Sequence, residues 1–102
     1  MGIEVKVSTP VNLSLSNAVR TQDDVALIAA TVTLIRERDQ LRRELIITNL
    51  MSNASEVRIG DHQVSTTRGI PLQPGETIVL DTVGVVYGFS TPGESVAVGE
   101  TF

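Results

Sequence analysis

The sequence predicts an all-β protein: a single antiparallel β-sandwich or jelly-roll-like barrel of about eight strands with an extended N-terminal segment. The chain has 102 residues, which is the length of one domain. Val, Ile and Thr make up about a third of it, and these β-branched residues fit a strand better than a helix. After residue 50, short alternating runs are separated by turn signals about 8–12 residues apart, as in sandwiches and barrels.

Composition excludes several functional classes. With no cysteine and one histidine, His62, the chain lacks a disulfide framework, a thiol nucleophile and a paired-histidine metal site. A net charge of −4 and a pI near 4.8 have the wrong sign for binding a phosphate backbone, so we expect no nucleic-acid partner. No run approaches the ~20 apolar residues that span a bilayer, and the N-terminus shows no export signal. We therefore expect no membrane partner.

The chain is expected to divide into an N-terminal arm or edge strands over residues 1–24 and a β-sandwich domain over residues 25–102. Ile3, Val5 and Val7 alternate with polar residues, which places them on one face of a short strand. Such a segment is suited to dock on another subunit by adding a strand to it.

Residues 17–24 contain few large apolar side chains and are expected to be a loop. Residues 25–50 have two interpretations. Leucines seven apart beside a charged stretch favour an amphipathic helix of about 22 residues. Runs of β-branched residues favour a hairpin instead, with strands over residues 26–35 and 42–50. The strand propensity of these β-branched residues favours the hairpin over the helix.

The later strands are expected over residues 56–59, 63–65, 76–81, 84–90 and 95–100. Gly60 is expected to begin a turn, and tight reversals are expected at Pro74-Gly75 and Pro92-Gly93. Proline presets φ for the second position of a type II turn, and glycine supplies the positive φ of the third.

No catalytic constellation is present: the chain has no phosphate-binding glycine loop and no nucleophile elbow. Asp61 and His62 are typical turn residues. We expect the protein not to be an enzyme and to bind no cofactor and no metal. Tyr87 and Phe89 occupy alternate positions and are expected in the core.

The segment of residues 36–44 is densely charged with nearly balanced sign. It has two interpretations, a solvated hairpin tip or a subunit contact. Under the second, Arg36, Arg38 and Arg42 are the candidate partner-binding residues, because arginine is enriched at protein interfaces.

A resemblance covers a little over half of the chain. The order of short motifs is Arg43 to Asn49, Ile59-Gly60, Val64-Ser65, Gly69 to Glu76, Val86 to Phe89 and Val96 to Glu100. This order resembles the small β-sandwich proteins of tailed-phage virions that are described as head-decoration, capsid-stabilising or head-fibre proteins.

The resemblance implies a structural virion protein, made in the host cytoplasm, that binds the outer surface of a phage capsid and stabilises it. The implied partner is the major capsid protein or another virion protein, and the expected state is a homo-oligomer, with a trimer as the preferred order. The alternative is a phage tail or fibre β domain that binds a host-surface ligand or another virion protein.

Overall fold

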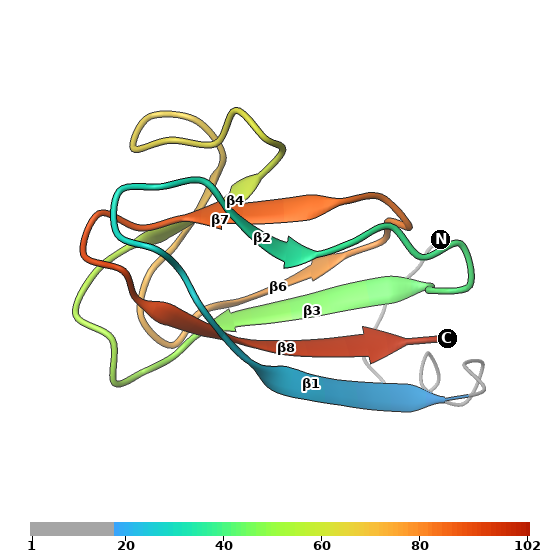
Figure 1. Ribbon diagram of the computed structural model, residues 1–102. Coiled ribbons are helices and arrows are strands. Elements are labelled where there is room, and N and C mark those ends of the chain that lie inside the picture. The colour runs from blue at the N-terminus through green and yellow to red at the C-terminus, as the bar shows by residue number, and fades with distance from the viewer. Residues whose placement is uncertain (1–17) are drawn as a thin grey trace.

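The computed structural model describes residues 18–102, which form eight β-strands (Figure 1). In chain order they are β1 (Val19–Ala26), β2 (Thr33–Arg36), β3 (Glu44–Asn49), β4 (Val57–Gly60), β5 (Ile70–Leu72), β6 (Thr77–Leu80), β7 (Val86–Phe89) and β8 (Ser95–Thr101). This part of the chain has no helix, and so none that could cross a membrane.

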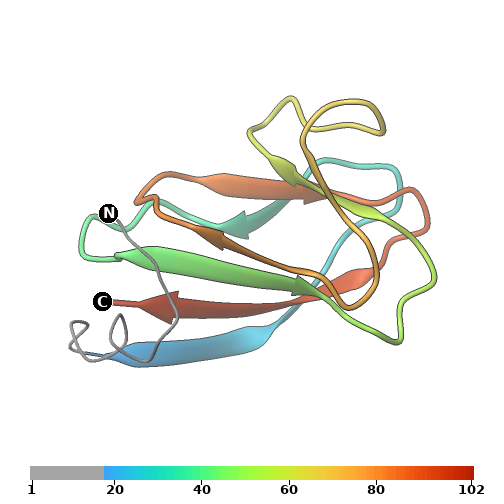
Figure 2. The same cartoon turned by 180° about the vertical axis from the view of Figure 1, so that it is seen from behind.

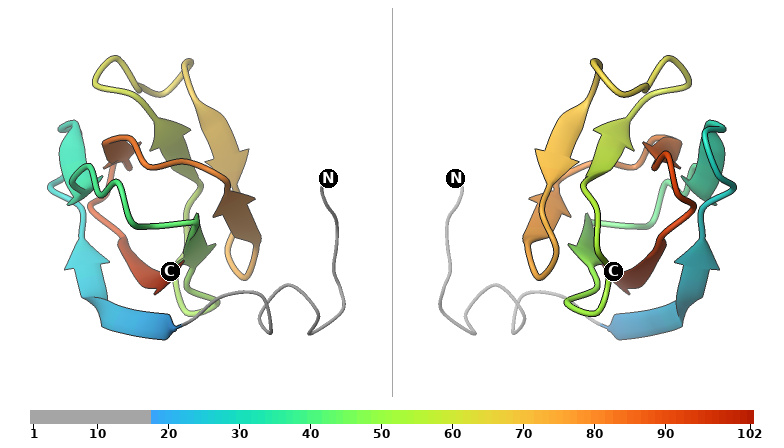
Figure 3. Two further views of the ribbon diagram at one scale, coloured as in Figure 1. Left: turned by 90° about the vertical axis from the view of Figure 1, so that its right-hand side faces the viewer. Right: turned by 90° about the vertical axis from the view of Figure 1, so that its left-hand side faces the viewer.

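The strands form two four-stranded sheets packed face to face (Figure 3). Sheet A has the order β1-β8-β3-β6, and sheet B has the order β2-β7-β4-β5. Every pairing is antiparallel. The predicted all-β sandwich of about eight strands is therefore confirmed. The residues between β4 and β5 project beyond the sandwich (Figure 2).

The core between the sheets is aliphatic. From sheet A, alternation turns Leu45 and Ile47 of β3 and Val96 and Val98 of β8 inward. They pack against buried side chains that the rest of the chain contributes: Leu27, Ile35, Val57, Ile59, Leu72 and Val86. The core cluster contains no aromatic ring, so branched aliphatic side chains form the apolar core between the sheets.

Residues 19–24, expected to be a loop, form most of edge strand β1. This strand pairs with β8 and carries a bulge between Gln22 and Val25. The loop was predicted because this segment has few apolar side chains. Most of β1 is exposed, however, and backbone hydrogen bonds to β8 hold it as an edge strand without such side chains. The expected domain boundary after residue 24 thus falls inside β1. The arm predicted before it, residues 1–17, lies outside the described residues.

Residues 25–50 form neither the expected helix nor the expected hairpin. A corner interrupts the strand predicted over residues 26–35. There Ala30 has a φ of 52°, and its N–H donates to the Ser90 carbonyl at 3.0 Å. The corner carries the chain from sheet A to sheet B, so β2 pairs with β7 while β3 pairs with β6 and β8. Periodicity cannot separate these topologies, because inward residues alternate in both.

The Pro74-Gly75 reversal is confirmed. The Glu76 N–H donates to the Gln73 carbonyl at 2.9 Å, and Gly75 has a φ of 89°. Proline and glycine thus occupy the second and third positions of a type II turn, as predicted.

The other predicted turns differ from expectation. The Gly93 N–H donates to the Ser90 carbonyl at 3.3 Å, so Gly93 ends its turn, one position later than expected. Gly60 is the last residue of β4, not a turn residue. The return strand expected over residues 63–65 is absent, and β4 pairs instead with β5, which follows a longer loop.

Two of these glycines give a matched test of backbone conformation. Gly75→Ala is expected to lower the free energy of unfolding by about 1–2 kcal/mol, because alanine at positive φ is strained. Gly60→Ala is expected to cause no loss, since an added Cβ would meet its nearest atoms at 3.6–3.7 Å, ordinary contact distances. Urea unfolding of both variants checks this, and equal losses would contradict it.

Candidate functional site

Arg42, expected at a solvent-facing partner contact, is buried inside the domain, with 0% of its side chain exposed. Its Nε donates to the Thr82 carbonyl at 3.0 Å, Nη1 to the Glu37 carbonyl at 3.1 Å, and Nη2 to the Gly84 carbonyl at 2.6 Å. These bonds tie the loop before β3 to the connection between β6 and β7. Arg42 is therefore a structural anchor, and its assignment to a partner contact was wrong.

Glu100 of β8 pairs with Arg42 inside the sandwich. Its carboxylate oxygens lie 3.1 Å from Arg42 Nη1 and 3.2 Å from Arg36 Nη2, and one accepts a hydrogen bond from Gln22 Nε2 at 2.9 Å. A buried charge is tolerated only when it is paired and hydrogen-bonded, and both oxygens meet this condition. Arg36 is thus engaged in the same cluster, although 34% of its side chain stays exposed.

The loop anchored by Arg42 holds Leu41 in solvent. Asp39 Oδ1 accepts the Leu41 N–H at 3.0 Å, and the Asp39 N–H donates to the Val83 carbonyl at 2.9 Å. Leu41 is 80% exposed. These bonds fix the loop, so Leu41 is exposed by a hydrogen-bonded loop structure.

Leu41 belongs to a wider exposed surface at this end of the molecule. We name it the apolar patch: Leu34, Leu41, Val83, Val85 and Tyr87. Leu34 lies opposite Tyr87 across β2 and β7, and Val85 precedes Tyr87 by two residues. The four aliphatic members are 39–80% exposed. The members of the patch come from the anchored loop, from the β6–β7 connection that is hydrogen-bonded to this loop, and from the outer face of sheet B.

Tyr87 and Phe89, expected in the core, are half-buried on the outer face of sheet B. The buried positions of β7 are Val86 and Gly88. A Cβ on Gly88 would lie 2.8 Å from Ile35 Cδ1, so a side chain there would displace core packing. The strand alternates as predicted, but the opposite set of residues faces the core. The prediction placed the two aromatic rings inside because they are larger and more apolar than a valine and a glycine.

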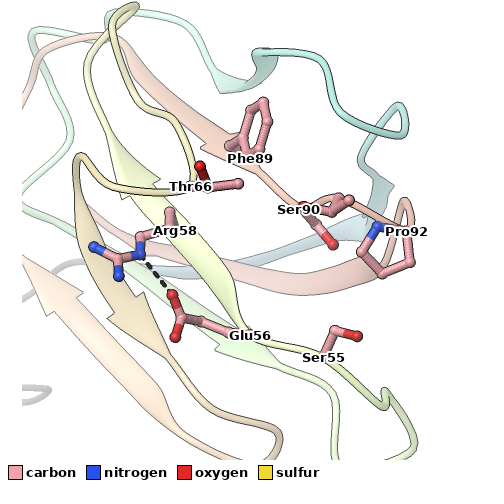
Figure 4. A pocket seen from close by; sticks show the side chains of 8 residues that line it. Ser55, Glu56, Arg58, Thr66, Phe89, Ser90 and Pro92 are labelled. Carbon is pink, nitrogen blue, oxygen red and sulfur yellow. Dashed lines mark hydrogen bonds and ion pairs between the residues drawn. The ribbon is translucent and has the colours of Figure 1, made fainter.

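Beyond the patch, Phe89 borders a surface hollow with a volume of about 290 Å³ (Figure 4). Its lining residues are Ser55, Glu56, Arg58, Thr66, Phe89, Ser90, Thr91 and Pro92. Arg58 Nε pairs with the Glu56 carboxylate, which also accepts a hydrogen bond from Gln73 Nε2 at 3.0 Å. An aromatic wall, several hydroxyls and a fixed ion pair therefore meet in one concave site, a combination that suits a small polar ligand.

The remaining predicted contact residues are only partly placed. Arg38 is exposed on the same loop as Leu41. Ile3, Val5 and Val7 lie outside the described residues. The apolar patch itself was missed because its members come from separate segments, and none of them stands out by local pattern.

The described residues hold no group of three or more acidic or histidine side chains that could bind a metal ion. No protein-family model matches the chain, and neither a curated protein nor a solved structure matches it significantly. Function is therefore inferred from the chemistry of the chain itself.

Arg42→Met is expected to lower the free energy of unfolding by about 3–5 kcal/mol, because it leaves Glu100 buried without its main partner. The double variant Arg42→Met, Glu100→Gln is expected to lose less than the sum of the two single losses. Arg38→Met, at an exposed position of the same loop, should stay within about 0.5 kcal/mol of the parent. Urea unfolding of the parent, Arg42→Met, Glu100→Gln, the double variant and Arg38→Met measures these losses, and a small loss for Arg42→Met would contradict the anchoring role.

Proposed function

We propose that the chain is a structural accessory protein of a tailed-phage virion that binds the outer surface of the capsid and stabilises it. The observation that carries this proposal is the apolar patch, in which Leu41 and Tyr87 are presented by a rigid frame. Tyrosine is enriched among the residues that supply most of the binding energy of protein interfaces, and an exposed apolar patch is typical of an interaction surface. The partner is the major capsid protein or another virion protein.

The resemblance of residues 43–100 to head-decoration proteins supports the same role. Its motif residues serve the fold: Asn49 is fully buried, and its Nδ2 donates to the Leu72 carbonyl at 2.8 Å. Pro74 and Gly75 form the type II turn between β5 and β6. The motifs thus support a shared sandwich, and the role rests on the surface that this sandwich presents.

Stabilisation in this proposal is mechanical. The apolar patch is buried only when the capsid shell is assembled, so binding favours the assembled shell by mass action. The protein is made in the host cytoplasm, acts on the virion surface as a homo-oligomer such as a trimer, and performs no catalysis. Ile3, Val5 and Val7 belong to the arm that contacts a neighbouring subunit.

A second candidate function has its own supporting observation. The hollow is lined by half-buried Phe89 together with hydroxyl side chains and the Arg58–Glu56 pair. Sugars bind to such combinations through stacking and hydrogen bonds. A tail or fibre domain that binds a host-surface glycan would use this site.

Capsid binding is tested by pelleting heads that lack this chain with the purified protein at micromolar concentration. Leu41→Ser and Tyr87→Ser are each expected to weaken co-sedimentation about 5- to 10-fold, the effect of losing an interface anchor. Met51→Ser is the matched control, because Met51 is 81% exposed but lies outside the patch. No co-sedimentation of the wild type, or equal losses for Leu41→Ser and Met51→Ser, would rule out this docking surface.

The glycan alternative predicts a different pattern. Wild-type protein should bind on a glycan array, Phe89→Ala should abolish the signal, and Tyr87→Ser should keep it, because Tyr87 does not line the hollow. An array without signal would remove the second candidate and leave capsid binding untouched.

A further inference from the structure

Edge strands expose backbone N–H and C=O groups that can pair with another chain, and proteins usually protect them. The sandwich has four edges, β1 and β6 in sheet A, and β2 and β5 in sheet B. Three of them carry protective features. β1 is bulged where Asp23 and Asp24 are exposed, β2 is irregular before Arg36, and β5 contains Pro71.

The fourth edge, β6, carries no such feature. Its four residues include no charged residue, proline or glycine, and it pairs with β3 in unbroken register. Thr77 is exposed, and Val79 is 54% exposed. β6 is therefore an open, uncharged edge, the type of strand that accepts a further strand from outside its own sheet.

The N-terminal arm has the sequence of a donor strand. Residues 3–7 alternate apolar and polar side chains, as a strand with one covered face requires. Residues 3–17 contain one proline, Pro10, and no glycine, so they lack a Pro-Gly pair like the one that forms the type II turn at Pro74-Gly75. Residues 3–7 end before Pro10, so this proline does not interrupt them as a strand.

The starting point of the arm favours a second molecule as the acceptor. The Ala18 carbonyl accepts the Phe102 N–H at 2.9 Å, so the chain still runs alongside the end of β8 there. β1 and β6 are opposite edges of sheet A, with β8 and β3 between them. An arm reaching its own β6 would have to turn back across sheet A, whereas an arm of residues 3–17 that continues outward spans about 50 Å when extended and can reach a second molecule. That span exceeds the 37 Å long dimension of the molecule.

We propose that residues 3–7 of one copy add a fifth strand to the free edge of β6 in a second copy of the chain. The proposal rests on the homo-oligomer in the proposed function and names the contact that builds it. Because donor arm and acceptor edge are different surfaces, the contact is heterologous, and it forms a closed ring when the rotation between neighbouring copies closes. Each copy then donates one arm and has one edge covered, while the apolar patch stays free for the capsid.

The absence of natural cysteines allows a direct test with full-length chains. Chains carrying Val79→Cys are mixed with differently tagged chains carrying one cysteine within residues 3–7, and the mixture is oxidised. At least one mixture is expected to give the disulfide-linked heterodimer on a non-reducing gel. Thr21→Cys, exposed on the opposite edge of sheet A, replaces Val79→Cys as the control. The yield of heterodimer with Thr21→Cys should be at least about tenfold lower than with Val79→Cys, because two cysteines held far apart cannot form a disulfide.

Molar mass by light scattering gives a second readout. Val79→Lys places a charge on the open edge, and it should shift the protein from an oligomer to the 10.9 kDa monomer. Removal of residues 1–17 should do the same, whereas Thr21→Lys should leave the oligomer intact.

Three outcomes would overturn the arm exchange: a monomeric wild type, an oligomer that survives Val79→Lys, or a bridge that forms only within one chain when both cysteines are present. If the oligomer survives Val79→Lys and heads still bind, the arm contact is wrong and capsid binding stands. If the arm crosslink forms but heads do not bind, capsid binding is wrong and the exchange stands.

Discussion

The buried ion pair of Arg42 and Glu100 dictates how one end of the sandwich is built. Since the guanidinium has no access to water, its N–H groups must find acceptors inside the protein, and three loop carbonyls supply them. Those loops are therefore fixed where the arginine needs them. The exposure of Leu41 follows, because Asp39 holds its backbone between Arg42 and Val83. The need to pair a buried arginine inside the protein thus leaves an apolar side chain, Leu41, exposed on its surface.

The aliphatic core has a related effect on the surface. Side chains such as Leu45 and Ile47 fill the space between the sheets, and Gly88 leaves room for Ile35. The core therefore contains no ring, and the rings of Tyr87 and Phe89 lie on the outer face of sheet B. The two sheets consequently differ in their possibilities for contact: sheet B offers side chains, and sheet A offers the backbone of an unprotected edge.

The sequence predicted correctly those elements that depend only on residues close together in the chain. Strands β6, β7 and β8 and the turn at Pro74-Gly75 follow from alternation and turn chemistry within a few residues. Decisions between distant segments were not predictable. Whether β3 pairs with β2 depends on the corner at Ala30, and whether Arg42 faces water depends on Glu100, 58 residues later. Arg42 stands among charged neighbours that are exposed, so no pattern within the segment distinguished it.

The place of β8 in the chain also governs when the fold can form during synthesis. It follows every other described strand, yet it lies between β1 and β3 and carries the carboxylate that Arg42 needs. Until it leaves the ribosome, sheet A lacks an interior strand and the arginine lacks its counter-ion. The domain therefore cannot fold progressively from its N-terminus, and its many non-local pairings predict folding in milliseconds to seconds. A nascent chain that stops short of β8 leaves sheet A incomplete and Arg42 without its counter-ion, so it cannot complete this fold.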